Sequence, residues 1–380
     1  MVKVSIVKCD SYDHAEIGVK KALDLIGGIK SFVKPGDSVL LKVNLLTPKP
    51  PEAAITTHPK MVEAMINIVH SASGEALVGD SSGGLGLTDK ALEVSGIRGV
   101  AEKLGAKVIN FDSAGTYTVD IPMGKELSKL YVAKPVMDAD VVVSMPKLKT
   151  HALTLYTGAV KNLFGTIPGG NKSLIHGITG SSERFSEALI DIYSVLPVHL
   201  AVMDGIVGME GLGPHMGTPK RSDVILASKE LVALDAVASS VMDFSPHDIP
   251  MLRIAKERGL GTIDLDKIDI VGENLDDVKV GFKKPYKIYK SLMFLPSSIR
   301  NLFVEKPRLP FPIKKKCTRC KICEENCPVD AIKVSNELYF DYNKCIICYC
   351  CYELCPEGGI ELKKSLLPRS SYQTRVKKVR

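Results

Sequence analysis

The 380-residue chain contains no tryptophan, and only 6% of its residues are aromatic. It also lacks any apolar run near the roughly 20 residues that a membrane-spanning helix needs, which argues against a transmembrane segment. Its first residues alternate as a strand does and carry no apolar signal-peptide core, so we expect a cytoplasmic protein. With 45% hydrophobic and 24% charged residues, the composition is that of an ordinary globular protein.

Cysteine is almost absent from the chain before Cys317, where only Cys9 occurs, and the other nine cysteines lie between Cys317 and Cys355. In a reducing cytosol, such a concentration indicates a metal site and not a disulfide framework. Eight of the nine form two runs of one pattern, in which three cysteines spaced by two residues precede a fourth that is followed by proline. The runs are Cys317, Cys320, Cys323 and Cys327, and Cys345, Cys348, Cys351 and Cys355.

The second run repeats the first at one constant offset, from Cys317 to Cys345 at its start and from Cys327 to Cys355 at its end, which indicates an internal duplication. Three thiolates at this spacing let one loop wrap an iron–sulfur cubane, whereas zinc ribbons use two separated cysteine pairs. The pattern resembles bacterial-type two-cluster ferredoxins over about residues 317–361. In that family the fourth cysteine ligates the other cluster. The resemblance therefore implies two [4Fe–4S] clusters, one on Cys317, Cys320, Cys323 and Cys355 and the other on Cys345, Cys348, Cys351 and Cys327.

Two basic segments flank this module. Residues 363–380 carry seven Lys or Arg and no acid, and residues 279–316 carry eleven against Glu305 alone. They are either a solvated linker and tail or a docking surface for an acidic partner or anionic lipid. No nucleic-acid-binding motif accompanies them, so we expect no nucleic-acid partner. We predict an α/β domain at 1–279, a basic Pro-containing linker at 280–313, a ferredoxin-type domain at 314–362 and a basic tail at 363–380.

The α/β domain is predicted because strand-like and helix-like segments alternate from the start of the chain to about position 275, which is typical of a mostly parallel sheet with flanking helices. The smaller module is expected to be α+β with a pseudo-two-fold repeat. Strands are predicted at 2–8, 38–45, 76–79, 108–111, 140–144, 198–203, 224–227 and 268–271. Helices are predicted at 15–26, from Pro59, and at 91–104, 187–196 and 231–242.

Polar residues follow several of these strands, at the edge where α/β folds bind ligands. Lysines within apolar sequence are costly to bury unless an anion pairs with them, so we predict a pocket for a carboxylate or phosphate. His151, Lys149 and Asp204 are the candidate catalytic residues. The glycine-rich stretch 165–173 resembles a phosphate loop but follows no strand, so we exclude it. The candidate ligand-binding residues are Lys42, Asn44, His58, Asp80, Ser81, Lys147, Lys149, His151, Lys161, Asn162 and Glu210.

Several motifs resemble the domain of unknown function 362 family over roughly residues 3–275. They are Val43-Asn44-Leu45-Leu46, Thr57-His58-Pro59, Gly79-Asp80-Ser81, Lys147-Leu148-Lys149-Thr150-His151, the TGAVKNLFG stretch at 157–165, and the stretch from Asp204-Gly205 to Gly213-Pro214. Members of this family often carry a ferredoxin module, as here. The resemblance implies no particular reaction.

Taken together, these features favour an iron–sulfur oxidoreductase in which the ferredoxin module exchanges electrons with an anionic small molecule on the α/β domain. A redox partner protein would charge the clusters. The alternatives are an electron-transfer subunit or adaptor of a larger complex, and a carrier in metal-cofactor assembly. Whether the chain is an enzyme stays open at this point.

Overall fold

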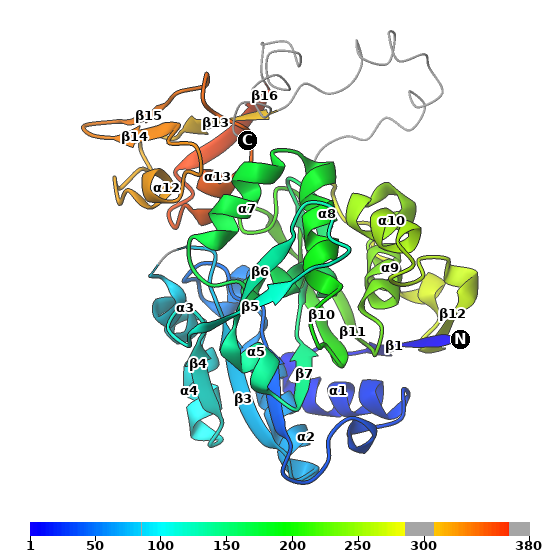
Figure 1. The fold of residues 1–380 in the computed structure, drawn as a ribbon. Helices are drawn as coiled ribbons and strands as arrows, with labels where there is room; N and C mark the ends of the chain where they lie inside the picture. Colours follow the sequence, from blue (N-terminus) through cyan, green and yellow to red (C-terminus); the bar gives the residue numbers. More distant parts are fainter. Residues whose placement is uncertain (85, 286–307, 365–380) are drawn as a thin grey trace.

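The computed structural model describes residues 1–84, 86–285 and 308–364. An α/β domain forms most of the molecule, and a small cysteine-rich module (308–364, hereafter the cysteine module) packs against one end of it (Figure 1). Most of the predicted linker, at 286–307, and the predicted tail from residue 365 lie outside the described residues.

A single twisted sheet forms the centre of the α/β domain. Along the main path of this sheet, neighbouring strands are parallel except where β11 lies between β1 and β10, to both of which it is antiparallel. A short connection joins β10 to β11, and such a connection allows only antiparallel pairing. The sheet is therefore mostly parallel, as predicted. Its main path runs β12 (Ile268–Gly272), β1 (Val2–Lys8), β11 (Thr218–Ser228), β10 (Leu200–Glu210), β7 (Val141–Ser144), β2 (Ser38–Lys42), β3 (Glu75–Asp80) and β4 (Lys107–Asn110).

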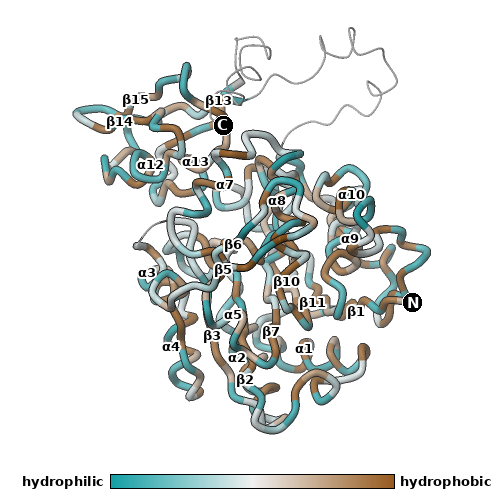
Figure 2. The backbone as a smooth tube through the Cα atoms, in the orientation of Figure 1, coloured by the Kyte–Doolittle hydropathy of each residue, from teal (hydrophilic) through white to brown (hydrophobic). Residues whose placement is uncertain are grey.

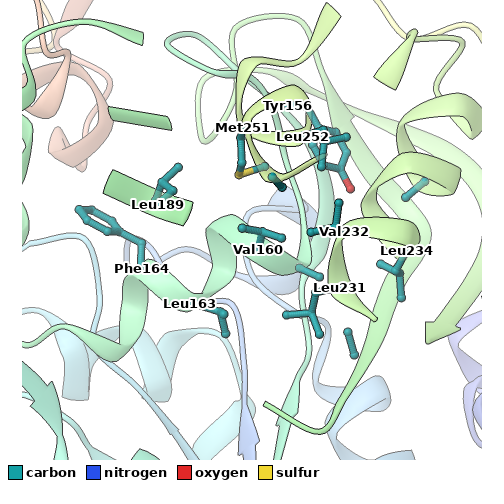
Figure 3. Close-up of a cluster of buried hydrophobic side chains, with 14 of the residues drawn as sticks. Tyr156, Val160, Leu163, Phe164, Leu189, Leu231, Val232, Leu234, Met251 and Leu252 are labelled. Carbon is teal, nitrogen blue, oxygen red and sulfur yellow. The ribbon is translucent and has the colours of Figure 1, made fainter. Parts of the chain in front are cut away.

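Helices cover both faces of this sheet because successive side chains of each central strand point to opposite faces. Leu40 belongs to one buried cluster and Leu41 to the other. Figure 3 shows part of the first cluster, where Val160 and Leu231 pack among other apolar side chains. One face is covered by α1 (Ala15–Asp24), α2 (Pro59–Ser71), α3 (Thr88–Val94) and α4 (Ile97–Lys103), and the other by α6 (Ala159–Asn162), α8 (Ser182–Tyr193), α9 (Leu231–Val241) and α10 (Pro250–Glu257).

The hydropathy of the backbone follows this layering. In Figure 2 the strands of the sheet are largely hydrophobic, whereas hydrophilic residues lie mostly on outer turns and outer helix faces. Among the described residues, no helix has the length and apolar character that crossing a membrane would require.

The structure corrects two local predictions. The helix predicted at 91–104 is two helices, α3 and α4, because Gly96 takes a left-handed conformation with φ of 75°. The stretch Lys147–His151, which lies past the end of the strand predicted at 140–144 and outside every predicted strand, is itself a strand, β8, which pairs with β10 and with β9 (Leu155–Thr157). The remaining elements of the domain are β5 (Thr116–Asp120), β6 (Lys129–Ala133), α5 (Lys134–Asp138) and α7 (Asn171–Thr179).

The cysteine module consists of two similar halves. Strand β14 (Ile332–Val334) pairs with β15 (Leu338–Phe340), and β16 (Ile360–Lys364) pairs with β13 (Arg308–Pro312). The starts of helices α12 (Ile322–Glu325) and α13 (Cys350–Leu354) are separated by the same offset as the two cysteine runs, and so are the starts of β14 and β16. Because β13 pairs with β16, residues 308–312 belong to this module and not to the linker where the prediction places them.

The cysteine module lies against loops at the end of the sheet where β2, β3 and β7 finish. Tyr352 donates a hydrogen bond from its hydroxyl to the carbonyl oxygen of Leu212 at 2.7 Å. Leu354 packs so closely on Gly83 that a Cβ atom there would lie 2.8 Å from its Cδ2 atom. Pro328 touches Gly177 of α7 in the same manner. The module therefore covers the edge of the sheet where the candidate ligand residues were predicted.

Candidate functional site

The ligand cysteines line two separate cavities in the cysteine module, each with about 340 Å³ of empty space. The members of each set come from both runs, so each fourth cysteine faces the three cysteines of the other run. This grouping is the one that the ferredoxin resemblance implies. The first cavity is lined by Cys317, Cys320, Cys323 and Cys355, and the second by Cys327, Cys345, Cys348 and Cys351 together with Cys350.

Backbone amides donate to the fourth cysteine of each run. The N–H of Ala331 lies 3.2 Å from the Sγ of Cys327, and the N–H of Gly359 lies 3.0 Å from the Sγ of Cys355. Such hydrogen bonds favour the thiolate form of a cysteine. They also tune the reduction potential of a cluster that the thiolate ligates. Among the described residues, no group of three or more His, Cys, Asp or Glu side chains is placed so that it could hold a single metal ion. Four thiolates around an open cavity instead fit a larger, multi-iron group.

His151 and Glu353 meet where the cysteine module touches the α/β domain. His151 ends β8, whereas Glu353 lies on α13, between two of the ligand cysteines. His151 Nε2 is 3.3 Å from Glu353 Oε1. His151 Nδ1 accepts the N–H groups of Leu153 at 3.1 Å and Thr154 at 3.3 Å. The neutral ring therefore carries its hydrogen on Nε2, which faces the carboxyl group of Glu353.

Burial governs the charge of both groups. Burial holds the pKa of His151 well below its usual value, and nearby Lys161 acts in the same direction. Burial raises the pKa of Glu353 to about 7, and Lys161 and Lys149 oppose this rise. The imidazole is consequently neutral at physiological pH.

Lys149 and Lys161 are the cations of this region. Lys149 is 2% exposed and donates from Nζ to the carbonyl oxygen of Ile55 at 2.7 Å. Lys161 lies over the rings of Phe164 and Phe185, with Nζ 5.7 and 5.6 Å from their centroids. In the described part of the chain, neither lysine has a carboxylate within 4 Å. Burial lowers the pKa of both, and for Lys149 the charges of three neighbouring lysines lower it further.

Lys42 and Asp80 form a second, fully buried group at the ends of β2 and β3. Their ion pair is 2.8 Å long, and Lys42 Nζ also donates to Asn162 Oδ1 at 3.1 Å. Gly165 packs directly over the pair, since a Cβ atom there would collide with Asp80 Oδ1 and Lys42 Nζ. Ser81 continues the network by donating to Asp112 at 2.6 Å. These residues satisfy one another and stabilise the edge of the sheet.

Lys147 and Asp204 form a third group on adjacent strands. Lys147 Nζ lies 2.8 Å from Asp204 Oδ2 and 2.7 Å from the hydroxyl of Tyr12. Asp204 also accepts the N–H of His58 at 2.9 Å, and the rings of Tyr12 and His58 stack 3.5 Å apart. Because its carboxylate is held by these donors, Asp204 is placed as a structural partner of Lys147.

Two predicted ligand residues have partners outside these three groups. Glu210 lies at the far end of β10, where Oε2 accepts the N–H of Lys283 at 2.9 Å. Asn44 follows β2, and its N–H donates to Thr57 Oγ1 at 2.8 Å. The eleven predicted residues therefore form three neighbouring groups, with Asn44 and Glu210 bonded to other residues, instead of one pocket.

Sequence reasoning missed two residues of this region. Lys172 belongs to the excluded stretch 165–173, yet it is buried and donates to Ser81 Oγ at 2.6 Å. Burial lowers the pKa of Lys172 to about 8. Glu353 lies among the cysteines, and its counterpart in the first half of the repeat, Glu325, is exposed. Nothing in the sequence distinguishes these two glutamates, whereas the glycine-rich stretch did mark Lys172.

Comparison with known proteins follows the same division of the chain. A model of the family described as Domain of unknown function (DUF362) matches residues 39–240, and a model of the 4Fe-4S binding domain matches residues 310–333. The second match identifies the cysteine module as a 4Fe–4S-binding domain, as the cysteine spacing predicts.

A relative and a solved structure are also similar to this chain. Over 307 residues it is 33% identical to "Thylakoid-associated protein sll1697" of Synechocystis sp., covering 80% of this chain and 94% of that protein. The lactate racemase apoprotein from Thermoanaerobacterium thermosaccharolyticum is similar with a TM-score of 0.42 and 15% identity, covering 64% of this chain and 58% of that one.

Proposed function

This chain belongs to the family described as Domain of unknown function (DUF362), and because that description names no reaction, we propose a function from the geometry of the site. The chain is an iron–sulfur oxidoreductase of the cytoplasm. Its cysteine module exchanges electrons with a small anionic molecule bound beside Lys149, His151 and Lys161. A protein redox partner supplies or removes the electrons.

Two [4Fe–4S] clusters fit the two cysteine cavities. Cys317, Cys320, Cys323 and Cys355 would hold the first, and Cys327, Cys345, Cys348 and Cys351 the second. Such clusters supply one-electron transfer at low potential when bound. The reducing conditions of the cytoplasm keep these thiols available as ligands.

The contact between His151 and Glu353 is the observation that carries the proposal. It joins the helix that holds ligand cysteines to the strand that carries Lys149 and His151. Cys350, which lines the second cavity, is also close enough to Lys161 to affect its pKa. The clusters and the cationic region thus lie on either side of one buried boundary.

An anionic ligand would balance the charge of this boundary. Burying an ammonium group without a counter-ion costs roughly several kcal/mol of free energy. Lys149 has only a carbonyl oxygen as its partner, and Glu353 is a single carboxyl group facing two lysines. A carboxylate or phosphate next to Lys149 and Lys161 would supply the missing charge.

The chain's own groups can also move protons to such a ligand. The lowered pKa of Lys149 makes its ammonium a better acid than an ordinary lysine, whereas the neutral ring of His151 donates only a hydrogen bond from Nε2. A reduction that adds electrons and protons to a carboxylate-bearing molecule would use both groups. His151 and Lys149 are therefore the proposed catalytic residues, and Asp204 is not.

Reoxidation of the reduced protein tests this function. The reconstituted full-length chain is reduced under anaerobic conditions, freed of excess reductant and mixed with a panel of small carboxylates and phosphate esters, while the visible absorbance of the clusters is followed. We expect at least one compound to reoxidise the wild-type clusters and to do so at least about tenfold more slowly in Lys149→Met.

Lys103→Met is the matched control, because Lys103 is an exposed lysine on α4, far from the cysteine module. If Lys149→Met and Lys103→Met are reoxidised at equal rates, the ligand does not lie beside Lys149. If no compound in the panel reoxidises the wild-type chain, the oxidoreductase function is overturned in favour of an electron-transfer subunit.

A further inference from the structure

Five exposed basic residues lie on, or directly before, the loop that carries the first three cysteines of the module, and we call them the basic rim; two of them line the first cysteine cavity. They are Lys314, Lys315, Lys316, Arg319 and Lys321. No acidic residue occurs within residues 314–323. The rim therefore presents one sign of charge along the loop that carries the first three cysteines of the module.

The basic rim encloses an exposed ligand cysteine. Cys320 is exposed, whereas Cys323 is buried. Beside it, a surface groove with about 550 Å³ of empty space is lined by Lys314, Arg319 and Cys317 among others. Cys317 and Arg319 also line the first cysteine cavity, so the groove adjoins that cavity directly.

Three glutamates lie near the basic rim without cancelling it, and one of them, the exposed Glu325, donates its N–H to the carbonyl oxygen of Lys321. Glu337 lines the groove and pairs with Lys314 at 2.8 Å, and both side chains are mostly exposed. Glu357 is exposed at the border of the first cavity. Five bases against three acids leave a positive excess at this surface.

The second cysteine cavity has a different environment. Its lining includes Pro310, Val329, Phe340 and Ile346 and contains no charged residue. It also includes Cys350, which lies on α13, the helix whose Glu353 contacts His151 of the α/β domain. The charged border therefore belongs to the first cavity alone, and the second cavity adjoins the proposed ligand.

We propose that the basic rim is the docking surface for an acidic one-electron carrier protein. Its acidic face would lie on Lys315, Lys316 and Arg319 and bring its redox centre close to Cys320. One electron leaves the reduced carrier, which is thereby oxidised, and enters the centre held at the first cavity, which is reduced by one electron. No atom or proton needs to move. Opposite charges on the two surfaces speed the encounter and select the partner.

This inference rests on the proposed function, because it assigns the entry point of the electrons in the same scheme. It also gives the two cavities different tasks. The first exchanges electrons with the carrier through the exposed side of the module, and the second passes them toward Lys149 and Lys161. An acidic carrier is favoured over a lipid surface because the rim surrounds a redox ligand and a groove and is not a flat, extended basic face.

Affinity for an acidic carrier tests the basic rim. The full-length chain is isolated anaerobically and titrated with purified acidic flavodoxin by isothermal calorimetry, and the triple variant Lys315→Glu, Lys316→Glu, Arg319→Glu is compared with wild type. We expect Kd to rise at least about tenfold, because three attractive charges become repulsive. The wild-type Kd should also rise steeply between low and high salt.

The matched control is the triple variant Lys20→Glu, Lys103→Glu, Lys107→Glu, whose residues are exposed and lie on elements at the opposite end of the molecule (Figure 1). It changes net charge equally and is expected to leave Kd within about twofold of wild type. Gel filtration and the visible spectrum show whether each variant is folded and loaded. If one should fail to fold, the salt dependence of wild-type binding still decides between a charged and an uncharged contact.

Three results would overturn the docking surface. They are equal losses of affinity in both triple variants, no loss in either, and a rim variant that loses binding to anionic lipid vesicles but keeps its affinity for the carrier. None of these results depends on reoxidation by a small anion. Failure of the docking surface and failure of the proposed reaction are therefore separate observations.

Discussion

His151 Nε2 lies 3.3 Å from Glu353 Oε1, although one residue ends a strand of the α/β domain and the other lies between cysteines of the 4Fe–4S-binding domain. Both side chains are buried. The contact brings the negative group of the cysteine module next to Lys149 and Lys161. It makes the two domains parts of one candidate site.

Replacing Glu353 should strengthen the binding of a small anion. In Glu353→Gln the side chain keeps its shape but loses the carboxylate that would repel an anionic ligand beside Lys149. We expect the Kd of any carboxylate or phosphate ester that reoxidises the protein to fall severalfold. The corresponding gain in binding free energy is about 1 kcal/mol, the scale of the repulsion between two nearby charges in a water-like dielectric. Calorimetric titration of the oxidised protein measures this change.

Glu325→Gln serves as the control for that experiment, because Glu325 is the exposed counterpart of Glu353 in the other half of the module. It is expected to bind the anion as wild type does. A weaker affinity in Glu353→Gln would contradict the prediction, since it would mean that the carboxyl group holds the ligand instead of repelling it.

Exchanging single cysteines should damage the two clusters separately. Cys355→Ser removes a ligand from the first cavity and Cys327→Ser removes one from the second, although each lies in the run that mainly lines the other cavity. We expect each variant to lose the paramagnetic signal of a different cluster after reduction.

Electron paramagnetic spectra of the reduced proteins make that comparison, with Cys350→Ala as the control. Cys350 is buried and is the cysteine of the second cavity that does not belong to either cysteine run. Its replacement should therefore leave both signals in place. The crossed assignment is wrong if Cys355→Ser abolishes the signal that depends on Cys345 and spares the one that depends on Cys317.

Removing one partner of the buried Lys42–Asp80 pair should destabilise the α/β domain. Asp80→Asn leaves the Lys42 ammonium inside the protein without its carboxylate, at a cost of about 3–5 kcal/mol. Denaturant unfolding followed by circular dichroism measures the loss. Asp120→Asn is the comparison, because the Asp120–Lys129 pair is solvent-exposed and should change stability by less than about 1 kcal/mol. Equal effects would mean that the buried pair is not ionic.

His176 should make the protein less stable as the pH falls. Burial lowers the pKa of His176 to about 3, and its ring stacks on Phe185 at 4.1 Å. Protons bind the unfolded chain from about pH 6.5 downward but reach the folded ring only near pH 3. Stability is therefore lost as the pH falls through this window, by about 2 kcal/mol at pH 5.

His176→Phe tests that pH dependence, because a phenyl ring fits between Phe164 and Phe185 and cannot be protonated. Within the described residues, Nδ1 of His176 has no hydrogen-bond partner that the change would remove. Denaturant unfolding at pH 7 and pH 5 should show a smaller loss in the variant, by about 2 kcal/mol, while other buried histidines keep part of the slope. An unchanged difference between the two pH values would show that protonation of His176 does not cause the loss of stability.

The sequence alone determined the features that depend on local chemistry. The periods of apolar residues predicted the eight strands on the main path of the sheet and most of the covering helices, because side-chain direction along a strand or helix follows directly from backbone geometry. The spacing of Cys317, Cys320 and Cys323 identified iron–sulfur binding for the same reason, since one short loop carries the ligands. The start of α2 at Pro59 is likewise a local property.

Only the tertiary structure decided how these parts form a site. Lys42 and Lys147 looked equivalent to Lys149 in the sequence, yet the first two lie against Asp80 and Asp204, whereas Lys149 has no carboxylate within 4 Å in the described structure. Ion pairing depends on which distant strands become neighbours, and no local pattern encodes it. The same holds for Glu353, which is buried beside His151 because the cysteine module packs on the end of the sheet, while Glu325 at the equivalent position of the repeat faces solvent.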